Sequence, residues 1–388
     1  MIKILLLSGF DMTGAHANAN AICVSKLMEA LKEYTEVTVD VACNGVVERT
    51  PVGNWKRNPL YMLRRIKRWP SYNPDVETAC RKELFEILSE HEYDCLFVPH
   101  KPFETVYAAC MAKLKFPNIK LYIYALDPIA NEIDANNGIG KHLFFLAQRA
   151  EERVFQIADH IFHMECNRKK YSEKKYEKYA SKFSFLDFPL IEHKNFQACD
   201  AVKYDSTKKV TIIYSGSLND TYRSPNYLLD VYELVSKKLN VELHFYAKGN
   251  SVTMIETFCD KNHTVKSFGY VSQEELAKII EEADCLVNIG NKFSDMLPSK
   301  LLIYFMTGKP IIHIKNQNDD ICTQYLDKYP LNVIVNESDS VEVSAKKIVD
   351  FITNNYHKRI SSAKVEEIFK YNTPRWNAEM IRDIIVEK

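Results

Sequence analysis

The sequence predicts an α/β protein built from two tandem, doubly wound parallel sheets. Short apolar runs of strand length alternate with stretches of helical periodicity along the whole chain, which is typical of parallel strands covered by helices. The alternation restarts near residue 210, after a stretch of low periodicity over residues 187–209. The length of 388 residues fits this division, because a domain commonly has roughly 150 residues.

In the first half, strand and helix candidates follow one another in the order that a parallel sheet requires. Short continuous apolar runs predict buried strands, and apolar residues at helical spacing predict the helices between them. The expected strands are residues 2–7, 37–42, 95–99, 121–125 and 160–164, and the expected helices include 20–33, 76–90 and 105–114.

The second half repeats the pattern and ends in a further helix. The expected strands are residues 210–214, 242–246, 265–268, 285–289, 310–314 and 332–334, the helices include 224–238 and 272–282, and a last helix, 375–387, follows Thr373-Pro374.

These elements predict two Rossmann-like domains of similar size. We expect a first domain over residues 1–190 and a second over 191–371, with a C-terminal helix (372–388) packed back on the first. Ligands of open α/β sheets bind at the carboxyl ends of the strands, so we expect the two domains to face a cleft.

Composition excludes several classes of protein. Lys plus Arg and Asp plus Glu both number 51, so no net field draws the chain to nucleic acid. No segment approaches the ~20 apolar residues of a membrane-spanning helix. The ten cysteines occur singly, without C-x-x-C spacing, which indicates neither a zinc ribbon nor a redox dithiol and favours a cytoplasmic location. His160 and His163 have ligand-like spacing but would point to opposite faces of a strand, so no metal site is expected.

Three loops of the first half place polar or small residues on the cleft side. Gly14 and Ala15, after the first strand, would let backbone N–H groups approach an anion, although they also fit an ordinary turn. They do not spell G-x-G-x-x-G, so no dinucleotide cofactor is expected. His16, in the same loop, is expected to touch substrate. Asp127 and His100 each follow a strand, and Asp127 also fits a turn before proline.

The second half carries the strongest signal, an ordered series of segments at expected strand ends. Each segment is weak by itself, and their fixed order makes the series specific. The series runs through Ser215-Gly216-Ser217, Arg223, Lys248-Gly249, Phe268-Gly269-Tyr270, Asn288, Asp295, Leu297-Pro298-Ser299-Lys300 and Gly308-Lys309-Pro310.

This series resembles the nucleotide-sugar domain of GT-B glycosyltransferases, especially the retaining family-four (glycosyl transferases group 1) enzymes. The resemblance is close over about residues 210–315 and extends to the first half only in architecture. It implies a GT-B fold and a hexosyltransferase that uses a nucleotide-diphosphate sugar, UDP-linked, as substrate and needs no cofactor. It also implies transfer to a glycan or lipid-linked acceptor, held by the first domain, in cell-surface or exopolysaccharide synthesis.

Physical chemistry supports a diphosphate site in this series. Gly216 would let a diphosphate pack against the backbone, and Arg223 and Lys300 would supply two cations. Residues 297–299 (Leu297-Pro298-Ser299) would open a helix whose N–H groups and dipole favour phosphate. Such contacts strengthen as the leaving diphosphate gains charge.

The resemblance assigns further donor contacts, residue by residue. Asp295 stands where the family has the first glutamate of its Glu-x7-Glu motif, near the sugar hydroxyls. The turn Phe268-Gly269-Tyr270 would hold the base, and Ser217, Lys248 and Asn288 would complete the donor site. The second glutamate, which grips the ribose, falls at Ile303, so the ribose would need another partner such as Glu275.

Three alternatives stay open at this stage. A degenerate donor site, suggested by Ile303, would make the chain a non-catalytic GT-B partner subunit. An inverting enzyme would use His16, held by Asp127, as general base, whereas in a retaining enzyme the donor phosphate itself can take the acceptor proton. An epimerase of the same fold would need carboxylates and histidines around the donor sugar, and the sequence does not assemble them.

One basic and aromatic stretch, residues 55–72, contains six Lys or Arg side chains and no acid. It fits an exposed loop and helix, or a peripheral contact with the inner face of the membrane, where each basic residue near anionic lipid contributes about 1 kcal/mol.

Overall fold

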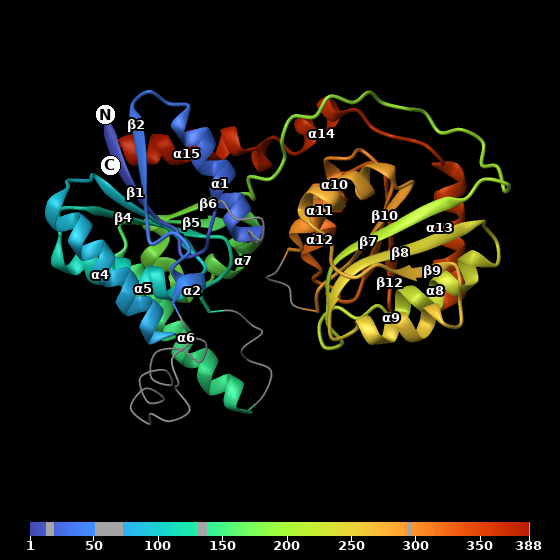
Figure 1. Ribbon diagram of the computed structural model, residues 1–388, viewed down its shortest axis with the longest axis horizontal. Helices are drawn as coiled ribbons and strands as arrows, with labels where there is room; N and C mark the ends of the chain where they lie inside the picture. The colour runs from blue at the N-terminus through green and yellow to red at the C-terminus, as the bar shows by residue number, and fades with distance from the viewer. Residues whose placement is uncertain (13–18, 51–72, 131–137, 293–296, 388) are drawn as a thin grey trace. The chain divides into compact units, whose positions relative to one another are not determined.

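The computed structural model describes residues 1–12, 19–50, 73–130, 138–292 and 297–387, with the backbone alone for 138–143. The chain divides into two compact units, and Figure 1 colours it by residue number, from blue at the N-terminus to red at the C-terminus. Unit 1 consists of Met1–Leu190 together with Tyr371–Lys388, and unit 2 consists of Ile191–Lys370.

Unit 1 is a six-stranded parallel sheet in the order β2-β1-β3-β4-β5-β6, covered by helices. The order reverses between β1 and β3, as in a doubly wound sheet. Its strands are β1 (Ile2–Leu7), β2 (Val37–Ala42), β3 (Cys95–His100), β4 (Lys120–Ala125), β5 (His160–Met164) and β6 (Phe183–Leu186). Its main helices are α1 (Ala19–Lys32), α2 (Val46–Arg49), α4 (Pro74–Glu90), α5 (Phe103–Lys115), α6 (Gly138–Ile157), α7 (Arg168–Tyr171) and α15 (Pro374–Glu387).

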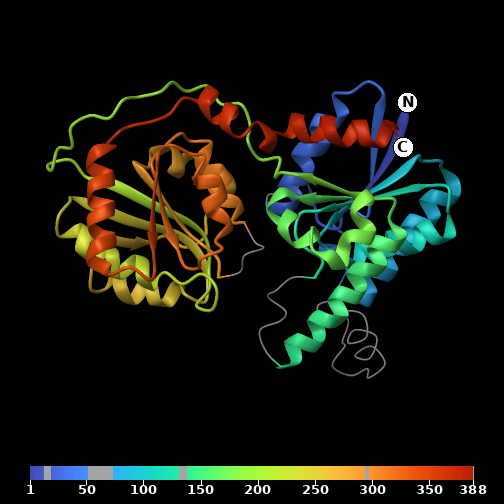
Figure 2. The same ribbon diagram turned by 180° about the vertical axis from the view of Figure 1, so that it is seen from behind.

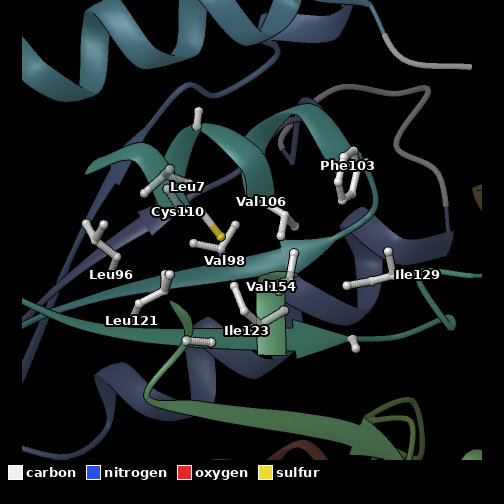
Figure 3. Packing of buried hydrophobic residues seen from close by; sticks show 14 of the residues in the cluster. Leu7, Leu96, Val98, Phe103, Val106, Cys110, Leu121, Ile123, Ile129 and Val154 are labelled. Carbon is white, nitrogen blue, oxygen red and sulfur yellow. The ribbon is translucent and has the colours of Figure 1, made fainter. Parts of the chain in front are cut away.

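The core of unit 1 lies between the sheet and its helices. Figure 3 shows Val106 and Cys110 of α5 pointing toward Val98 of β3, and all three side chains are buried. The central strands β1, β3, β4 and β5 are buried on both faces, which explains why they are continuous apolar runs rather than alternating ones.

The last helix, α15, completes unit 1 by packing against α1. Figures 1 and 2 show the two helices side by side from opposite directions. Ala378, Ile381 and Ile385 form its buried face. On its outer side, the Arg382 guanidinium lies 4.4 Å from the centroid of the Tyr34 ring.

Unit 2 is a second six-stranded parallel sheet, in the order β12-β11-β10-β7-β8-β9. The order reverses between β7 and β10, and this switch point is where doubly wound sheets bind ligands. Its strands are β7 (Val210–Leu218), β8 (Val241–Gly249), β9 (Val265–Ser267), β10 (Cys285–Ile289), β11 (Ile311–Lys315) and β12 (Asn332–Asn336). Its helices are α8 (Asn226–Ser236), α9 (Val252–Cys259), α10 (Gln273–Glu282), α11 (Ser299–Phe305), α12 (Ile321–Leu326), α13 (Val341–Asn354) and α14 (Ser362–Ile368).

The predicted class, two doubly wound parallel sheets, is confirmed, with three differences in detail. Strand β6 was not expected from the sequence. Strands β7 and β8 extend beyond the expected ends because they stay paired as far as Leu218 and Gly249. Helix α8 begins at Asn226, two residues after the expected start at 224. Within the described ranges, no helix combines the length and the apolar character needed to cross a membrane.

Candidate functional site

The carboxyl ends of β7, β8, β9 and β10 bring polar residues to the switch point of unit 2. Most of the segments singled out in the sequence lie at these four strand ends or at the starts of α10 and α11. The site described here therefore lies within unit 2 alone.

At the end of β7, Gly216 provides a small backbone surface. Its φ of 144° is a conformation that favours glycine, whereas a Cβ there would only reach the Tyr214 hydroxyl at 3.4 Å. The preceding Ser215 is tied to α11, because its N–H donates to the Tyr304 hydroxyl at 2.8 Å. The same hydroxyl lies 2.9 Å from Ser215 Oγ, so Tyr304 fixes α11 against β7.

Arg223 is placed by backbone pairing rather than by a helix start. Asn219 and Arg223 exchange two backbone hydrogen bonds of 3.0 and 2.8 Å in a tight bridge before α8. The Arg223 guanidinium donates from Nε and Nη2 to Asn291 Oδ1, at 3.0 and 2.7 Å. Its Nη1 donates to the carbonyl of Ser217 at 3.2 Å. The side chain is half-buried and points back toward the end of β7.

Two lysines lie near each other beside this arginine. Lys300, in the first turn of α11, donates from Nζ to Gln273 Oε1 at 2.8 Å. Burial, and then the charge of Lys248, lower the pKa of Lys300 to about 8. The Lys248 ammonium, at the end of β8, lies 4.8 Å from the centroid of the Tyr270 ring. An anion between these lysines would relieve their mutual repulsion.

An aromatic surface adjoins the lysines. The Tyr246 and Phe268 rings stack with centroids 4.9 Å apart and an interplanar angle of 8°. Phe268 and Tyr270 are 48% and 56% exposed, which is unusual for side chains of this size. Gly269, between them, has a φ of 68° and nothing within 4 Å of the place of a Cβ. The turn therefore offers ring faces and an open backbone to a flat ligand.

Asn288 differs from the expectation that it contacts substrate. Its side chain is buried, and its Nδ2 donates to His313 Nδ1 at 2.9 Å. His313 Nε2 in turn lies 2.8 Å from Asp320 Oδ2. The Asn288 amide thus belongs to an internal hydrogen-bond network with His313 and Asp320. This network forms because β11, which carries His313, is the neighbour of β10 in the sheet.

This internal network is also a group that could hold a metal ion among the described residues. Ligand atoms of His313, Asp320 and Cys322 lie within 4.8 Å of one another. The His313–Asp320 hydrogen bond already satisfies two of them, and burial raises the pKa of the Cys322 thiol well above its usual value. These three residues are therefore explained by their hydrogen bonds and do not require a metal ion.

The candidates of unit 1 are less accessible than the sequence suggested. His100 is only 2% exposed, and its Nδ1 lies 3.1 Å from the carbonyl oxygen of Asp127. Burial, then the charge of Lys101, lower the pKa of His100 to about 3, so its imidazole is neutral and enclosed. The Asp127 carboxylate is half-buried, with Oδ2 3.7 Å from Lys101 Nζ. His100 therefore differs from the expected substrate contact, since the sheet and its loops enclose the ring.

Several expected site residues lie outside the described residues. They are Gly14, Ala15, His16, Asp295 and the whole of the basic stretch, residues 55–72. Leu297, Pro298 and Ser299 lead into α11, whose N-cap residue is Pro298.

The sequence reasoning did not single out Asn291, Gln273 or Tyr304. Each makes a side-chain hydrogen bond to a site residue. Asn291 carries the one available signal, since it is a polar residue just past a buried strand that ends at the switch point.

Comparison with known proteins identifies unit 2. Residues 209–354 match the family described as glycosyl transferases group 1. This match lies within unit 2 and covers most of it. The resemblance found in the sequence is thereby confirmed, and the chain is a glycosyltransferase of the GT-B fold. Among curated proteins, none matches this chain.

Several solved structures share the fold over the full length. Anabaena HepE, in complex with UDP and glucose, is 11% identical with a TM-score of 0.63, covering 100% of both chains. The lipopolysaccharide outer core galactosyltransferase WaaB is 10% identical with a TM-score of 0.58, covering 100% of this chain and 99% of its own. A UDP-GlcNAc 2-epimerase from Neisseria meningitidis also matches, at 9% identity and a TM-score of 0.60, covering 100% of both chains. At these identities the likeness concerns the fold alone.

Proposed function

We propose that this glycosyltransferase moves a sugar from a UDP-sugar to a glycan or lipid-linked acceptor in cell-surface or exopolysaccharide assembly. One observation carries the proposal. Arg223, Lys248 and Lys300 lie at the carboxyl ends of the unit 2 strands, and in the described part of the chain none of them forms an ion pair with a carboxylate. Three uncompensated cations at a switch point suit a diphosphate.

The same cations explain how the reaction would be accelerated. The diphosphate gains negative charge as its bond to the sugar breaks, so fixed cations bind the transition state more tightly than the ground state. We propose that they take the place of a metal ion, so that EDTA leaves activity unchanged. Loss of activity with EDTA, restored by Mg²⁺, would refute this part of the proposal.

The exposed aromatic turn would receive the nucleotide base. The faces of Phe268 and Tyr270 and the open backbone at Gly269 suit a flat heterocycle next to the diphosphate cations. The HepE structures contain UDP, which supports a uracil nucleotide as the donor here. Asp295 would contact hydroxyls of the donor sugar.

The acceptor would bind to unit 1, near Asp127 and the loop of His16. We propose retention of the anomeric configuration, with the leaving phosphate taking the acceptor proton and no strong protein base required. NMR of the first-formed product distinguishes the outcomes, because an inverted anomeric centre would point instead to His16 and Asp127 as a base pair.

We also propose a peripheral location at the cytoplasmic face of a membrane, through residues 55–72. Replacing Arg64, Arg65, Lys67 and Arg68 by Ser should abolish sedimentation with anionic liposomes and preserve the melting temperature. Unchanged sedimentation would remove the membrane contact from the proposal.

A thermal-shift series tests the donor. UDP should raise the melting temperature of the wild type more than ADP, GDP or dTDP, because a ligand at 100 times its Kd stabilises a protein by about 2.7 kcal/mol. The Arg223→Gln variant is the matched control and should respond weakly. If no nucleotide stabilises the wild type, the chain is a non-catalytic partner subunit.

Steady-state kinetics test the two cations that the sequence and the structure both indicate. Arg223→Ala and Lys300→Ala should each lower kcat/KM by about 2–4 kcal/mol, near 30- to 1,000-fold, with little loss of folding stability. Wild-type rates in both variants would place the donor site elsewhere.

A further inference from the structure

We propose that Asn291 is the positioning residue of the donor site, and that its amide orients Arg223 without neutralising it. This inference rests on the proposed diphosphate site and names a residue that the sequence analysis did not consider. In this arrangement an uncharged side chain orients the guanidinium toward the phosphate, and the guanidinium keeps its full positive charge.

Arg223 and Asn291 are joined by a pair of hydrogen bonds that share one acceptor. Two N–H groups of Arg223, on Nε and Nη2, converge on one oxygen, Asn291 Oδ1, at 3.0 and 2.7 Å. A third, on Nη1, reaches the Ser217 carbonyl at 3.2 Å. A guanidinium has five N–H groups in one plane, so these three bonds fix that plane. The Tyr214 side chain also makes a hydrogen bond with Arg223, so at most two N–H groups serve a ligand.

Both fixed acceptors are neutral. An amide oxygen and a backbone carbonyl accept hydrogen bonds but bring no negative charge, and among the described residues no carboxylate pairs with Arg223. A carboxylate at position 291 would keep the same two hydrogen bonds and would cancel the cation in a half-buried place, where charge pairs are strong. Because residue 291 is an amide rather than a carboxylate, the positive charge of Arg223 remains available to attract an anion.

Asn291 is itself held firmly. It is 2% exposed, and its carbonyl accepts from Gln317 Nε2 at 2.9 Å. The preceding carbonyl, of Gly290, accepts from Asn316 Nδ2 at 2.7 Å, and the following N–H, of Lys292, donates to the Tyr222 carbonyl at 3.0 Å. Hydrogen bonds on both sides thus fix the backbone at Asn291. Because this backbone sets the position of the Asn291 side chain, it also sets the position of the guanidinium that binds to Oδ1.

Calorimetric titration of two Asn291 variants tests the inference, with UDP, inorganic pyrophosphate and uridine as probes. Asn291→Asp keeps the size and the acceptor, and Asn291→Leu removes the acceptor. Both should weaken UDP and pyrophosphate binding about tenfold or more, whereas uridine, which has no phosphate, should bind as to the wild type. The melting temperatures serve as controls for folding, and the near-isosteric Asp variant remains informative if the Leu variant unfolds.

A double-variant cycle shows whether Asn291 acts through Arg223. In an Arg223→Gln background, Asn291→Leu should cause no further loss of pyrophosphate affinity, because the guanidinium that Asn291 would orient is gone and the variant adds no charge. Equal losses in both backgrounds, or equal losses for uridine and UDP, would overturn the positioning role in favour of a general structural effect.

The outcomes separate this inference from the proposed function. Pyrophosphate binding without UDP binding by the wild type would refute the UDP donor and leave the Asn291 test in force. Full UDP affinity in Asn291→Asp would refute the inference and leave the donor site standing. If the wild type binds neither probe, both are wrong.

Discussion

Lys300 lies in surroundings that disfavour the charged form of its amine. Its ammonium group is partly buried beside Lys248 and has only the neutral Gln273 as a hydrogen-bond partner in the described structure. Burial and the neighbouring charge both favour the neutral amine, which accounts for the pKa near 8. A bound diphosphate would reverse this preference, so proton binding and ligand binding are coupled at this residue.

The affinity for UDP should therefore fall as pH rises from 7 to 9.5. Below pH 8 the Lys300 ammonium is already present in the free protein, and above it binding must first restore the proton. Titration calorimetry across this range measures the slope. In Lys300→Arg, whose side chain stays charged, the slope should be flat. Identical slopes in the two proteins would mean that Lys300 is not in contact with the diphosphate.

His163 is a buried polar ring in unit 1. Among the residues that the structure describes, no group forms a hydrogen bond with either of its ring nitrogens, and the ring stacks on Tyr171 with centroids 3.7 Å apart. Burial, then the charges of Lys170 and His160, lower its pKa well below the usual value. The native state therefore does not take up the proton that the unfolded chain takes up near pH 6.5.

Replacing His163 by Phe should stabilise the protein most in acid. The contribution of His163 falls as pH drops below about 6.5, because only the unfolded state binds the extra proton there. Urea unfolding at pH 5 and pH 8 should show a larger gain for the variant at pH 5, while exposed His263→Gln should alter neither. A gain independent of pH would show that the ring is protonated in the native state.

At the scale of elements, the paired ends of β7 and β8 position the site. The two strands remain in register to Leu218 and Gly249, which places Ser217 opposite Lys248. The backbones approach so closely at Gly249 that a Cβ there would overlap the Leu218 carbonyl. The φ of Gly249, 121°, also favours glycine.

Gly249→Ala should lower both the stability and the affinity for UDP. The overlap is with backbone, so no side-chain rotation relieves it and the strand ends must separate, at a cost of about 2 kcal/mol or more. Gly45→Ala, in unit 1, is the matched control, since its φ of 66° carries only the conformational cost, about 1 kcal/mol. Urea unfolding and UDP titration check both, and equal losses in the two variants would contradict the close approach.

At the scale of the whole molecule, the two units have separate cores. Each sheet is enclosed by its own helices, and α15 returns to unit 1 after the chain has built unit 2. All the described residues that we assign to the donor lie in unit 2. The chain should therefore unfold in two thermal transitions, of which only one responds to UDP.

Two alanine variants assign these transitions. Ile381→Ala, in α15, should lower the transition that UDP does not shift, and Ile352→Ala, in α13, should lower the one that UDP does shift. Both side chains are buried, and such truncations typically cost 2–5 kcal/mol. Scanning calorimetry with and without UDP measures both, and a single transition lowered by either variant would show that the units unfold together.

Much of the fold was predictable because it depends on local patterns. Continuous apolar runs such as those of β1 and β10 predict buried parallel strands wherever the chain later pairs them. Strand β6 escaped because Phe183–Leu186 is short and only Leu186 in it is buried, so its apolar signal is weak. The start of α8 was misjudged by two residues, because the bridge between Asn219 and Arg223 that precedes it leaves no periodic signal.

The sequence by itself determined the class of fold, its division into two sheets, and the glycosyltransferase family of the second unit. These depend on periodicity and on the order of short segments, which the chain carries locally. Only the tertiary structure decided that Asn291 orients Arg223, and that the Asn288 amide bonds to His313. The same holds for the pKa of Lys300, which burial and then the charge of Lys248 lower. The physical reason is that burial, charge coupling and hydrogen bonding depend on which strand ends become neighbours, and strand order is set by packing across the whole sheet.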